Sequence, residues 1–115
     1  MSMRESTYFL LAALFDGRRH GYAIVKKVGE LSGGRTKLAT GTLYATLDRL
    51  TADGLVAADG EEIVNGRARR YYVLTEEGAA AVRAEAGRMA AAARIITDRA
   101  DVARIAPVTP RAGTA

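Results

Sequence analysis

The stretch TGTLYATLDRLTADGLV, residues Thr40 to Val56, has the pattern of a short amphipathic helix followed by an apolar run. Leu43, Leu47 and Leu50 recur at intervals of four and three residues, so they share one side of a helix. Gly54 is a natural end for that helix. The opposite side carries small and polar residues. A helix anchored on one side and slim on the other is suited to approach a partner closely.

A first helix is predicted near the beginning of the chain. Ser2 and Glu5 have the spacing of a capping box, and Gly17 is a natural stop. Apolar residues between them recur at helical spacing, which predicts a helix from about Met3 to Phe15. The apolar segment is short and follows a lone arginine, so we interpret it as a core helix rather than a signal peptide.

A second helix is predicted from His20 onward, ending at the Ser-Gly-Gly break of residues 32–34. Its pattern places Tyr22, Val25 and either Val28 or Gly29 along one side. A short connection then leads to the helix that begins with Thr40, whose hydroxyl makes it the expected N-cap.

A β-hairpin is predicted after Gly54, because Asn65-Gly66 separates two apolar runs and is a strong turn signal. On the return strand Tyr72 and Leu74 fall on one face, with Tyr71 and Val73 on the other. Three short helices followed by a hairpin predict a mainly α fold with a β-hairpin (α+β), namely a winged helix-turn-helix.

A long helix is predicted to complete the fold. Thr75 is its expected N-cap, and Glu76 and Glu77 lie in the positive first turn. We therefore expect a winged helix-turn-helix DNA-binding domain over residues 1–75 and a C-terminal dimerisation helix over 76–106. Residues 107–115 contain two prolines and have no apolar periodicity, which predicts a disordered tail.

The composition restricts the class of protein. The 115 residues are 49% hydrophobic and carry a net charge of +4, which favours a polyanionic partner, although a basic surface can also serve solubility alone. There is no cysteine, and no apolar run is long enough to span a membrane, so we expect a cytoplasmic protein with no membrane partner.

Catalysis and metal binding have little support in the sequence. The chain has one histidine, no cysteine, no nucleophile elbow and no clustered acidic pair. His20 precedes a Gly-Tyr at a helix start, which favours a capping or packing role over that of a general base. Scattered carboxylates offer no recognisable ligand set. We expect no enzyme activity and no cofactor.

The slim side of the third helix holds the candidate DNA-contacting residues, because the first turns of a recognition helix meet base edges and phosphates. Thr40 can cap the helix, contact DNA or do both, and Tyr44 can donate to a phosphate or simply pack. Asp48 would repel phosphates unless it pairs with an arginine or contacts a cytosine amino group. The predicted contacts on this segment are Lys37, Thr40, Gly41, Thr42, Tyr44 and Arg49.

The hairpin tip supplies the second basic element. Arg67, Arg69 and Arg70 lie within four residues, and no acidic residue occurs between Ile63 and Leu74. Such a cluster can lie along a phosphate ridge or enter the minor groove, although it can also be a solvated turn.

A stripe along the last helix predicts self-association. Its positions alternate in steps of four and three, and none is charged. It can pack on the first helix of its own chain or on a second copy, and we favour dimerisation because the helix outruns the core of the domain. Its predicted interface residues are Val82, Ala86, Met89, Ala93, Ile96 and Ala100. Two copies would place two recognition helices one DNA turn apart, on a palindromic operator.

The chain resembles the PadR family of bacterial transcription regulators, in particular its small subfamily with a single C-terminal helix. The residues that carry the resemblance are HGYAI (His20–Ile24), GTLYATLDRL (Gly41–Leu50), DGLV (Asp53–Val56) and GRARRYYVLTEEG (Gly66–Gly78). The resemblance implies a homodimeric repressor whose third helix enters the major groove of double-stranded DNA. It also implies that Tyr44 lies near phosphate and that Arg67 and Arg69 form the basic wing tip.

Two further points follow from the resemblance. Many relatives carry Ser-Pro just before the Gly-Thr pair, where this chain has Ala39 and Thr40. Some small relatives bind flat apolar effectors between subunits, which makes Tyr8, Phe9 and Phe15 the candidate effector pocket.

The chief alternative function is a winged helix that binds other proteins and not DNA, but such domains usually lose the basic wing.

Overall fold

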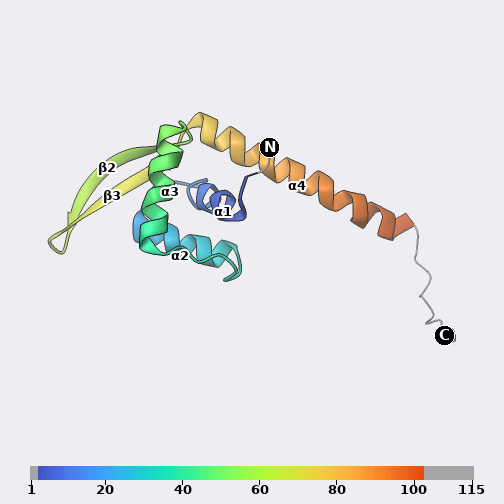
Figure 1. Ribbon diagram of the computed structural model, residues 1–115, viewed down its shortest axis with the longest axis horizontal. Coiled ribbons are helices and arrows are strands. Elements are labelled where there is room, and N and C mark those ends of the chain that lie inside the picture. Colours follow the sequence, from blue (N-terminus) through green and yellow to red (C-terminus); the bar gives the residue numbers. More distant parts are fainter. Residues whose placement is uncertain (1–2, 103–115) are drawn as a thin grey trace. The chain divides into compact units, whose positions relative to one another are not determined.

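A computed structural model describes residues 3–102, which form helices and a small antiparallel sheet (Figure 1). The chain divides into two compact units, the first ending at Glu85 and the second beginning at Ala86, and each is described by itself. This α+β fold confirms the expected fold class. The elements are α1 (Glu5–Ala13), β1 (Arg19–His20), α2 (Gly21–Leu31), α3 (Thr40–Ala52), β2 (Val56–Val64), β3 (Arg67–Leu74) and α4 (Glu76–Val102).

The core of the first unit lies between the three short helices and the base of the hairpin. Leu43, Leu47 and Leu50 are all buried, which confirms that the leucine side of α3 anchors it. Burying leucine side chains of this kind stabilises a fold by roughly 1.5–3 kcal/mol each. The other buried core residues are Leu10, Leu11, Ala13, Leu14, Ile24, Val28, Leu38, Val56, Tyr72 and Val82.

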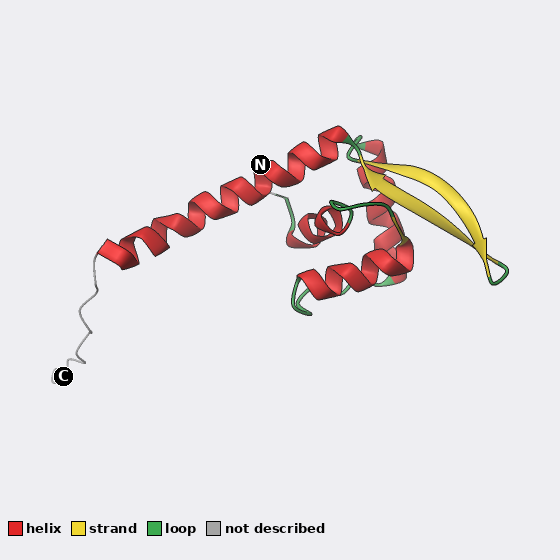
Figure 2. Ribbon diagram, turned by 180° about the vertical axis from the view of Figure 1, so that it is seen from behind, coloured by secondary structure: helices red, strands yellow, loops and turns green. Residues whose placement is uncertain are grey.

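The sheet has the strand order β1-β3-β2, with both pairings antiparallel. The predicted turn is confirmed, because Asn65 and Gly66 both have positive φ, at 52° and 75°, as a two-residue hairpin turn requires. The register shifts between Ala58 and Glu61, and such a bulge bends and twists a strand. Figure 2 shows the two long strands (yellow) curving together toward the turn.

The two-residue strand β1 was not predicted from the sequence. It pairs Arg19 with Tyr72 and His20 with Tyr71, so it joins the start of α2 to the hairpin. A strand this short has no periodicity to detect, and only the distant β3 defines it. Because β1 pairs with β3, backbone hydrogen bonds hold the wing to the start of α2.

Two of the predicted helix starts are wrong. The N-cap of α1 is Arg4 and the helix begins at Glu5, whereas it was expected from about Met3; Ser2 of the predicted capping box lies outside the described residues. In α3 the N-cap is Ala39, whose carbonyl accepts from the Leu43 amide at 2.9 Å, and Thr40 is already helical. The Thr40 hydroxyl is therefore not used as a cap.

The buried side of α2 also differs from the prediction. Gly21, Ile24 and Val28 are buried, whereas Tyr22 is 74% exposed. Tyr22 was expected on the apolar side from its helical spacing to Val25 and to Val28 or Gly29, and of these Val28 is buried as predicted. The exposure of Tyr22 one residue after the buried Gly21 leaves its phenol at the surface.

The start of α4 is capped as predicted. The Thr75 hydroxyl accepts from the Gly78 amide at 2.9 Å and donates to the Gly54 carbonyl at 2.6 Å. This links the helix to the segment that ends α3.

The predicted boundaries at residues 75 and 106 stay predictions, and the predicted disordered tail, 107–115, lies outside the described residues. Over residues 3–102 we find no helix with the length and apolar character needed to cross a membrane.

Candidate nucleic-acid interface

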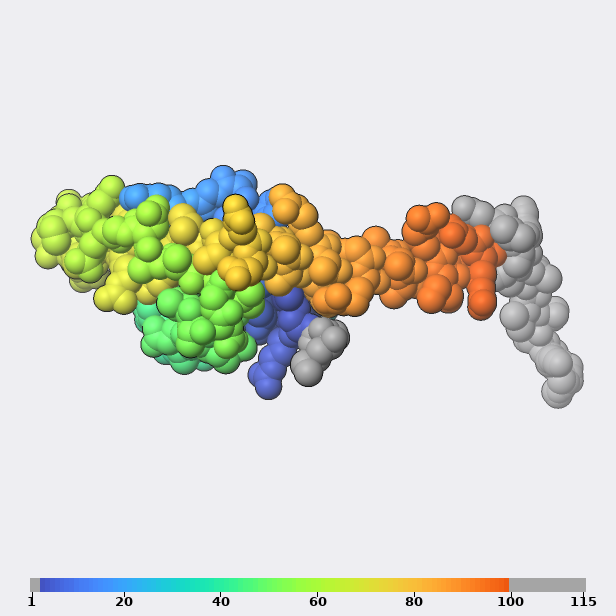
Figure 3. Space-filling view, turned by 90° about the horizontal axis from the view of Figure 1, so that it is seen from above, coloured from blue at the N-terminus to red at the C-terminus, as the bar shows by residue number. Residues whose placement is uncertain are grey.

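The exposed side of the first turns of α3 carries small side chains, as the sequence predicted. Thr40, Gly41, Thr42 and Ala45 are all exposed, while the leucines on the other side are buried. No atom would lie within 4 Å of a Cβ added to Gly41, so this end of the helix faces open space. Lys37 is also exposed, in the loop before α3. In Figure 3 the hairpin (yellow-green) and α3 (green) lie at the surface of the first unit.

The three wing arginines are all exposed but have different neighbours. Arg67 is paired with Val64 across the hairpin, whereas Arg69 faces Glu62 and Arg70 faces Glu61. Within residues 3–102, Arg67 has no hydrogen bond or ion pair. Arg67 is therefore the wing arginine whose charge is least compensated.

Arg70 lies on the side of the hairpin that faces α3. Hydrogen bonding to the Tyr72 side chain and the nearby charges of Tyr72, Glu61 and Asp48 raise the pKa of Arg70, which stays charged. A pocket lined by these residues also contains Tyr44 and Ala68. Asp48 thus has an arginine near it, which favours charge compensation over a base contact among the roles left open by the sequence.

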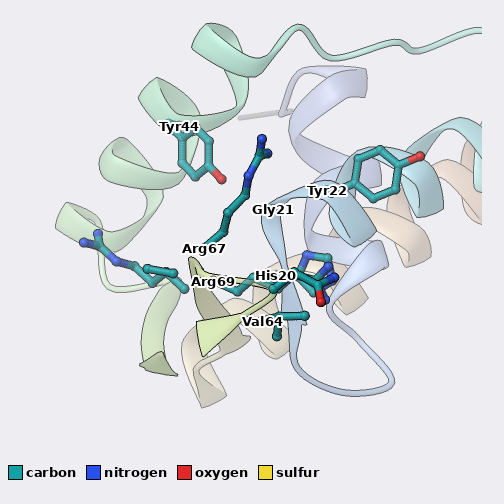
Figure 4. Close-up of a pocket in the computed structure, with 10 residues that line it drawn as sticks. His20, Gly21, Tyr22, Tyr44, Val64, Arg67 and Arg69 are labelled. Atoms are coloured by element: carbon teal, nitrogen blue, oxygen red, sulfur yellow. The ribbon is translucent and has the colours of Figure 1, made fainter. Parts of the chain in front are cut away.

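A pocket of about 460 Å³ lies where the wing, the start of α2 and α3 meet (Figure 4). In Figure 4, Arg67 rises from the wing toward the side on which the Tyr44 phenol points. None of the lining residues is a carboxylate, and we call this feature the basic pocket. Its lining residues are His20, Gly21, Tyr22, Tyr44, Val64, Asn65, Arg67, Ala68, Arg69 and Arg70.

Gly21 determines where the phenol of Tyr44 lies. A Cβ added at Gly21 would overlap the Tyr44 phenol oxygen and would lie 3.3 Å from Leu43 Cδ2. The ring therefore packs against the start of α2, while Tyr44 remains 42% exposed. Both roles considered for Tyr44 are compatible with this position, because its ring packs and its hydroxyl stays accessible.

His20 packs against the outer face of the hairpin. Its ring meets Tyr71 edge to face, with centroids 5.5 Å apart, and Arg18 stacks on Tyr71 at 3.9 Å. Tyr71 donates to Glu62 at 2.9 Å, and Arg18 forms an ion pair with the same carboxylate. Burial, followed by the charge of Arg69, lowers the pKa of His20, and Glu62 opposes this effect.

Protonation of His20 should make the free energy of unfolding depend on pH. Because its pKa in the fold lies below the ordinary value of 6.5, the unfolded chain binds more protons near that pH. The stability from neutral His20 is thus present above pH 6.5 and is lost as the pH falls through the folded pKa. Urea unfolding from about pH 8 to about pH 6 should show stability falling with pH in the wild type and less so in His20→Asn. Equal pH slopes would contradict the assignment.

Arg49 was predicted to contact DNA, but in the structure its side chain reaches the first helix. Its guanidinium donates to the Thr7 hydroxyl of α1 at 3.4 Å, so it links two helices. It also lines a shallow pocket with Arg4, Thr42, Ala45 and Thr46. A contact between Arg49 and DNA therefore stays a prediction, and it would compete with the bond to Thr7.

The three candidate effector-binding aromatics do not form one cluster. Tyr8 and Phe9 contact each other edge to face at 5.4 Å and are partly buried. Phe15 is 48% exposed and lies under the Arg83 guanidinium, 5.2 Å from its ring centroid. Phe15 lines a shallow groove of about 410 Å³ without Tyr8 or Phe9. The structure therefore separates Phe15 from the other two.

The predicted interface stripe divides between the two units. Val82 is buried in the core of its own chain, so its assignment to an interface between copies needs correction. In the second unit Met89 and Ile96 are 42% and 65% exposed, and Ala93 is also exposed. Ala86 is half-buried, and the side chain of Ala100 lies outside the described residues.

Over the described part of the chain, no cluster of three or more acidic or histidine residues is arranged to hold a metal.

Some residues of the basic pocket were missed by the sequence reasoning. Tyr22 was assigned to the apolar side of α2, and Asn65 was treated only as a turn residue. The signal that was available is the HGY stretch itself, since a glycine between two aromatic polar residues allows close approach of another element. What it approaches, Tyr44, lies more than 20 residues away and was not predictable from spacing.

A winged helix-turn-helix with small exposed side chains on its third helix, and with a wing in which Arg67 has no acidic partner among residues 3–102, has the features of a DNA-binding fold. The chain belongs to the transcriptional regulator PadR-like family, whose model matches residues 10–84. The family is described as one of transcriptional regulators, and the matched segment spans less than two thirds of the length of the relatives similar in sequence. The family assignment agrees with the motifs from His20 to Gly78.

Known transcriptional regulators resemble the chain in sequence and fold. A transcriptional regulator from Mycobacterium tuberculosis is 43% identical over 67 residues, which cover 58% of this chain and 59% of that relative. A PadR family regulator from Clostridium difficile has a TM-score of 0.68 at 25% identity, covering 83% of this chain and 97% of the other. PadR from Bacillus subtilis in complex with operator DNA has a TM-score of 0.61 at 25% identity, covering 70% and 45%.

Proposed function

We propose that the protein is a homodimeric repressor that acts in the cytoplasm and binds a palindromic operator. The first turns of α3, with Gly41 and Thr42 exposed, enter the major groove. Tyr44 and the wing arginines contact the adjacent sugar–phosphate backbone, which positions the helix. The exposed apolar residues of α4 join two copies.

The basic pocket is the observation that carries this proposal. Ten residues from β1, α2, α3 and the β2–β3 hairpin meet without a carboxylate, and the wing contributes three guanidinium groups. A protein-binding winged helix has no need for such a surface. The Bacillus subtilis relative was solved with operator DNA, which supports the same partner for this chain.

Replacing Arg67 by Ala tests the backbone contact. Each neutralised phosphate adds about 0.9 to the slope of log affinity against log salt. We expect Arg67→Ala to weaken binding on every duplex alike and to flatten the slope by about 1 per half-site. Fluorescence anisotropy titrations of labelled duplexes at several salt concentrations measure both quantities.

Arg94→Ala is the matched control for that experiment. It removes the same charge from an exposed position in α4, where Arg94 pairs with Asp98 at 3.7 Å. Its slope should equal that of the wild type. An unchanged slope for Arg67→Ala would refute the assignment of the wing to phosphate contact. Thr42→Ala, in contrast, is expected to change which DNA sequences the protein prefers.

Release by a small apolar effector completes the proposal. The groove beside Phe15, which also includes Leu14 and Arg83, supports it because it offers an exposed aromatic ring next to a cation. Titration of the protein–operator complex with planar aromatic compounds measures release. We expect Phe15→Ala to reduce the response of the complex without abolishing DNA binding.

A further inference from the structure

Arg69 and Glu62 face each other across the wing but do not form an ion pair. The two residues are direct cross-strand partners in the β2–β3 hairpin. Opposite charges in such positions attract each other, because their Cβ atoms lie only about 5 Å apart. Among residues 3–102, however, Arg69 has no hydrogen bond or ion pair. The Glu62 carboxylate must therefore be held by other groups.

Both oxygens of the Glu62 carboxylate accept hydrogen bonds from other donors. Oε1 accepts from the Tyr71 hydroxyl at 2.9 Å, and Oε2 accepts from Arg18 Nη2 at 3.4 Å. Tyr71 lies two residues after Arg69 on β3, on the same face of the hairpin and nearer to its base. The carboxylate is thus bound on the side of Tyr71 and not by Arg69.

Arg18 joins these groups from outside the hairpin. Its guanidinium stacks on the Tyr71 ring, 3.9 Å from the centroid, and forms the ion pair with Glu62. It also donates to the Asp59 carbonyl at 3.4 Å and lies 3.7 Å from the Asp59 carboxylate. A planar guanidinium can stack on a ring and donate from its edge at the same time. One side chain therefore contacts both long strands of the wing.

The position of Arg18 follows from the short strand after it. Arg18 directly precedes β1, whose residues Arg19 and His20 pair with Tyr72 and Tyr71 of β3. The His20 ring also packs edge to face on Tyr71, with centroids 5.5 Å apart. Backbone pairing and ring packing thus keep Arg18 beside the hairpin, although the two are far apart in the sequence.

We propose that Arg18 is a positioning residue for DNA binding, because it holds Glu62 against Tyr71 and so leaves Arg69 free to meet a backbone phosphate. This inference rests on the proposed function, in which the wing arginines contact the backbone. Arg18 itself does not touch the duplex. Without Arg18, the Glu62 carboxylate pairs with Arg69, and the DNA has to displace it.

Arg18→Gln tests this role, since it removes the guanidinium and keeps a polar side chain. We expect binding about tenfold weaker on all duplexes, and a salt slope flatter by up to about 1 per half-site, because Arg69 is then already paired. Anisotropy titrations at several salt concentrations measure both quantities. The midpoint of urea unfolding should change little, because the side chains of Arg18 and Glu62 are 40% and 53% exposed.

A second substitution at Glu62 identifies the mechanism. Arg18→Gln/Glu62→Gln has no carboxylate opposite Arg69, so its affinity should return to within about twofold of the wild type. Arg18→Gln/Asp59→Asn is the matched control, because it has the same net charge and Asp59 also pairs with Arg18 but has no cross-strand position opposite Arg69. It should bind as weakly as Arg18→Gln. Equal rescue by both double variants would indicate an effect of net charge, and rescue by neither would indicate a direct DNA contact of Arg18. Either result would overturn the proposal.

Hydrogen exchange of the Arg69 Nε–H, measured by NMR, tests the same claim without DNA. An ion pair slows this exchange, so we expect it to be fast in the wild type, slower in Arg18→Gln and fast again in Arg18→Gln/Glu62→Gln. Exchange that Arg18→Gln leaves unchanged would refute the hold on Glu62. Wild-type DNA affinity of Arg18→Gln would overturn the role of Arg18 alone, whereas failure of the wild type to bind any duplex would refute the proposed function and this role with it.

Discussion

Gly78→Ala is expected to lower the free energy of unfolding of the protein by about 2–3 kcal/mol. A Cβ at Gly78 would overlap the Leu55 carbonyl oxygen and lie 2.9 Å from its carbonyl carbon. This obstacle is backbone, so no side-chain rotation can relieve it. The same Leu55 carbonyl accepts from the Thr75 amide at 3.1 Å, so moving the helix also disturbs its start. Urea unfolding at one fixed protein concentration measures the change.

Gly29→Ala serves as the control for this substitution. Gly29 also lies in a helix, and no atom is within 4 Å of a Cβ placed there. Alanine is favoured over glycine in helices by about 1 kcal/mol, so this variant should be slightly more stable than the wild type. Equal stability of the two variants would contradict the close packing of α4 on Leu55.

Ile96→Asp is expected to convert the proposed dimer to monomers and to weaken operator binding by about 100-fold or more. Ile96 is 65% exposed in the second unit, and Met89, two turns earlier in the chain, is 42% exposed. A carboxylate buried between two helices would lose its hydration without gaining a partner. A monomer also loses the gain in effective concentration that comes from linking two DNA-binding domains. Sedimentation and anisotropy measure the two effects.

Ala91→Asp is the matched control, because Ala91 lies in the same helix on the opposite side of the helical wheel from Ile96. It introduces the same charge and should remain dimeric. An Ile96→Asp variant that still sedimented as a dimer would show that the stripe is not the interface. Retention of full operator affinity by monomeric Ile96→Asp would show that pairing does not matter for binding.

Strong local signals were enough to predict most of the fold. The leucine spacing of α3, the Asn65-Gly66 turn and the Thr75 cap were each correct because a few adjacent residues determine them. The helix starts were less predictable. Ala39 is the N-cap of α3 without a side-chain hydrogen bond, so backbone geometry and the burial of the following leucines outweighed the capping preference of Thr40.

The candidate site was only partly predictable, because it depends on contacts between distant segments. The sequence identified Tyr44 and Arg67 as separate candidates and the structure places both around one pocket. Strand β1, which attaches the start of α2 to the hairpin, has no pattern of its own. Val82 followed the apolar stripe of α4 but is buried in its own domain, since one periodicity can serve a core and an interface in turn.

The most direct test of the account measures wild-type affinity for a palindromic duplex selected by the protein from random sequences, over about 50–200 mM salt. If Arg67 and Arg69 of both copies each neutralise one phosphate, the slope of log affinity against log salt is about −3.6, and any further phosphate contact makes it steeper. Tight binding by a dimer with such a slope is the predicted result. Binding that does not change with salt, or no binding at the lowest salt, would contradict the central claim that the wing and α3 together form a DNA-binding surface.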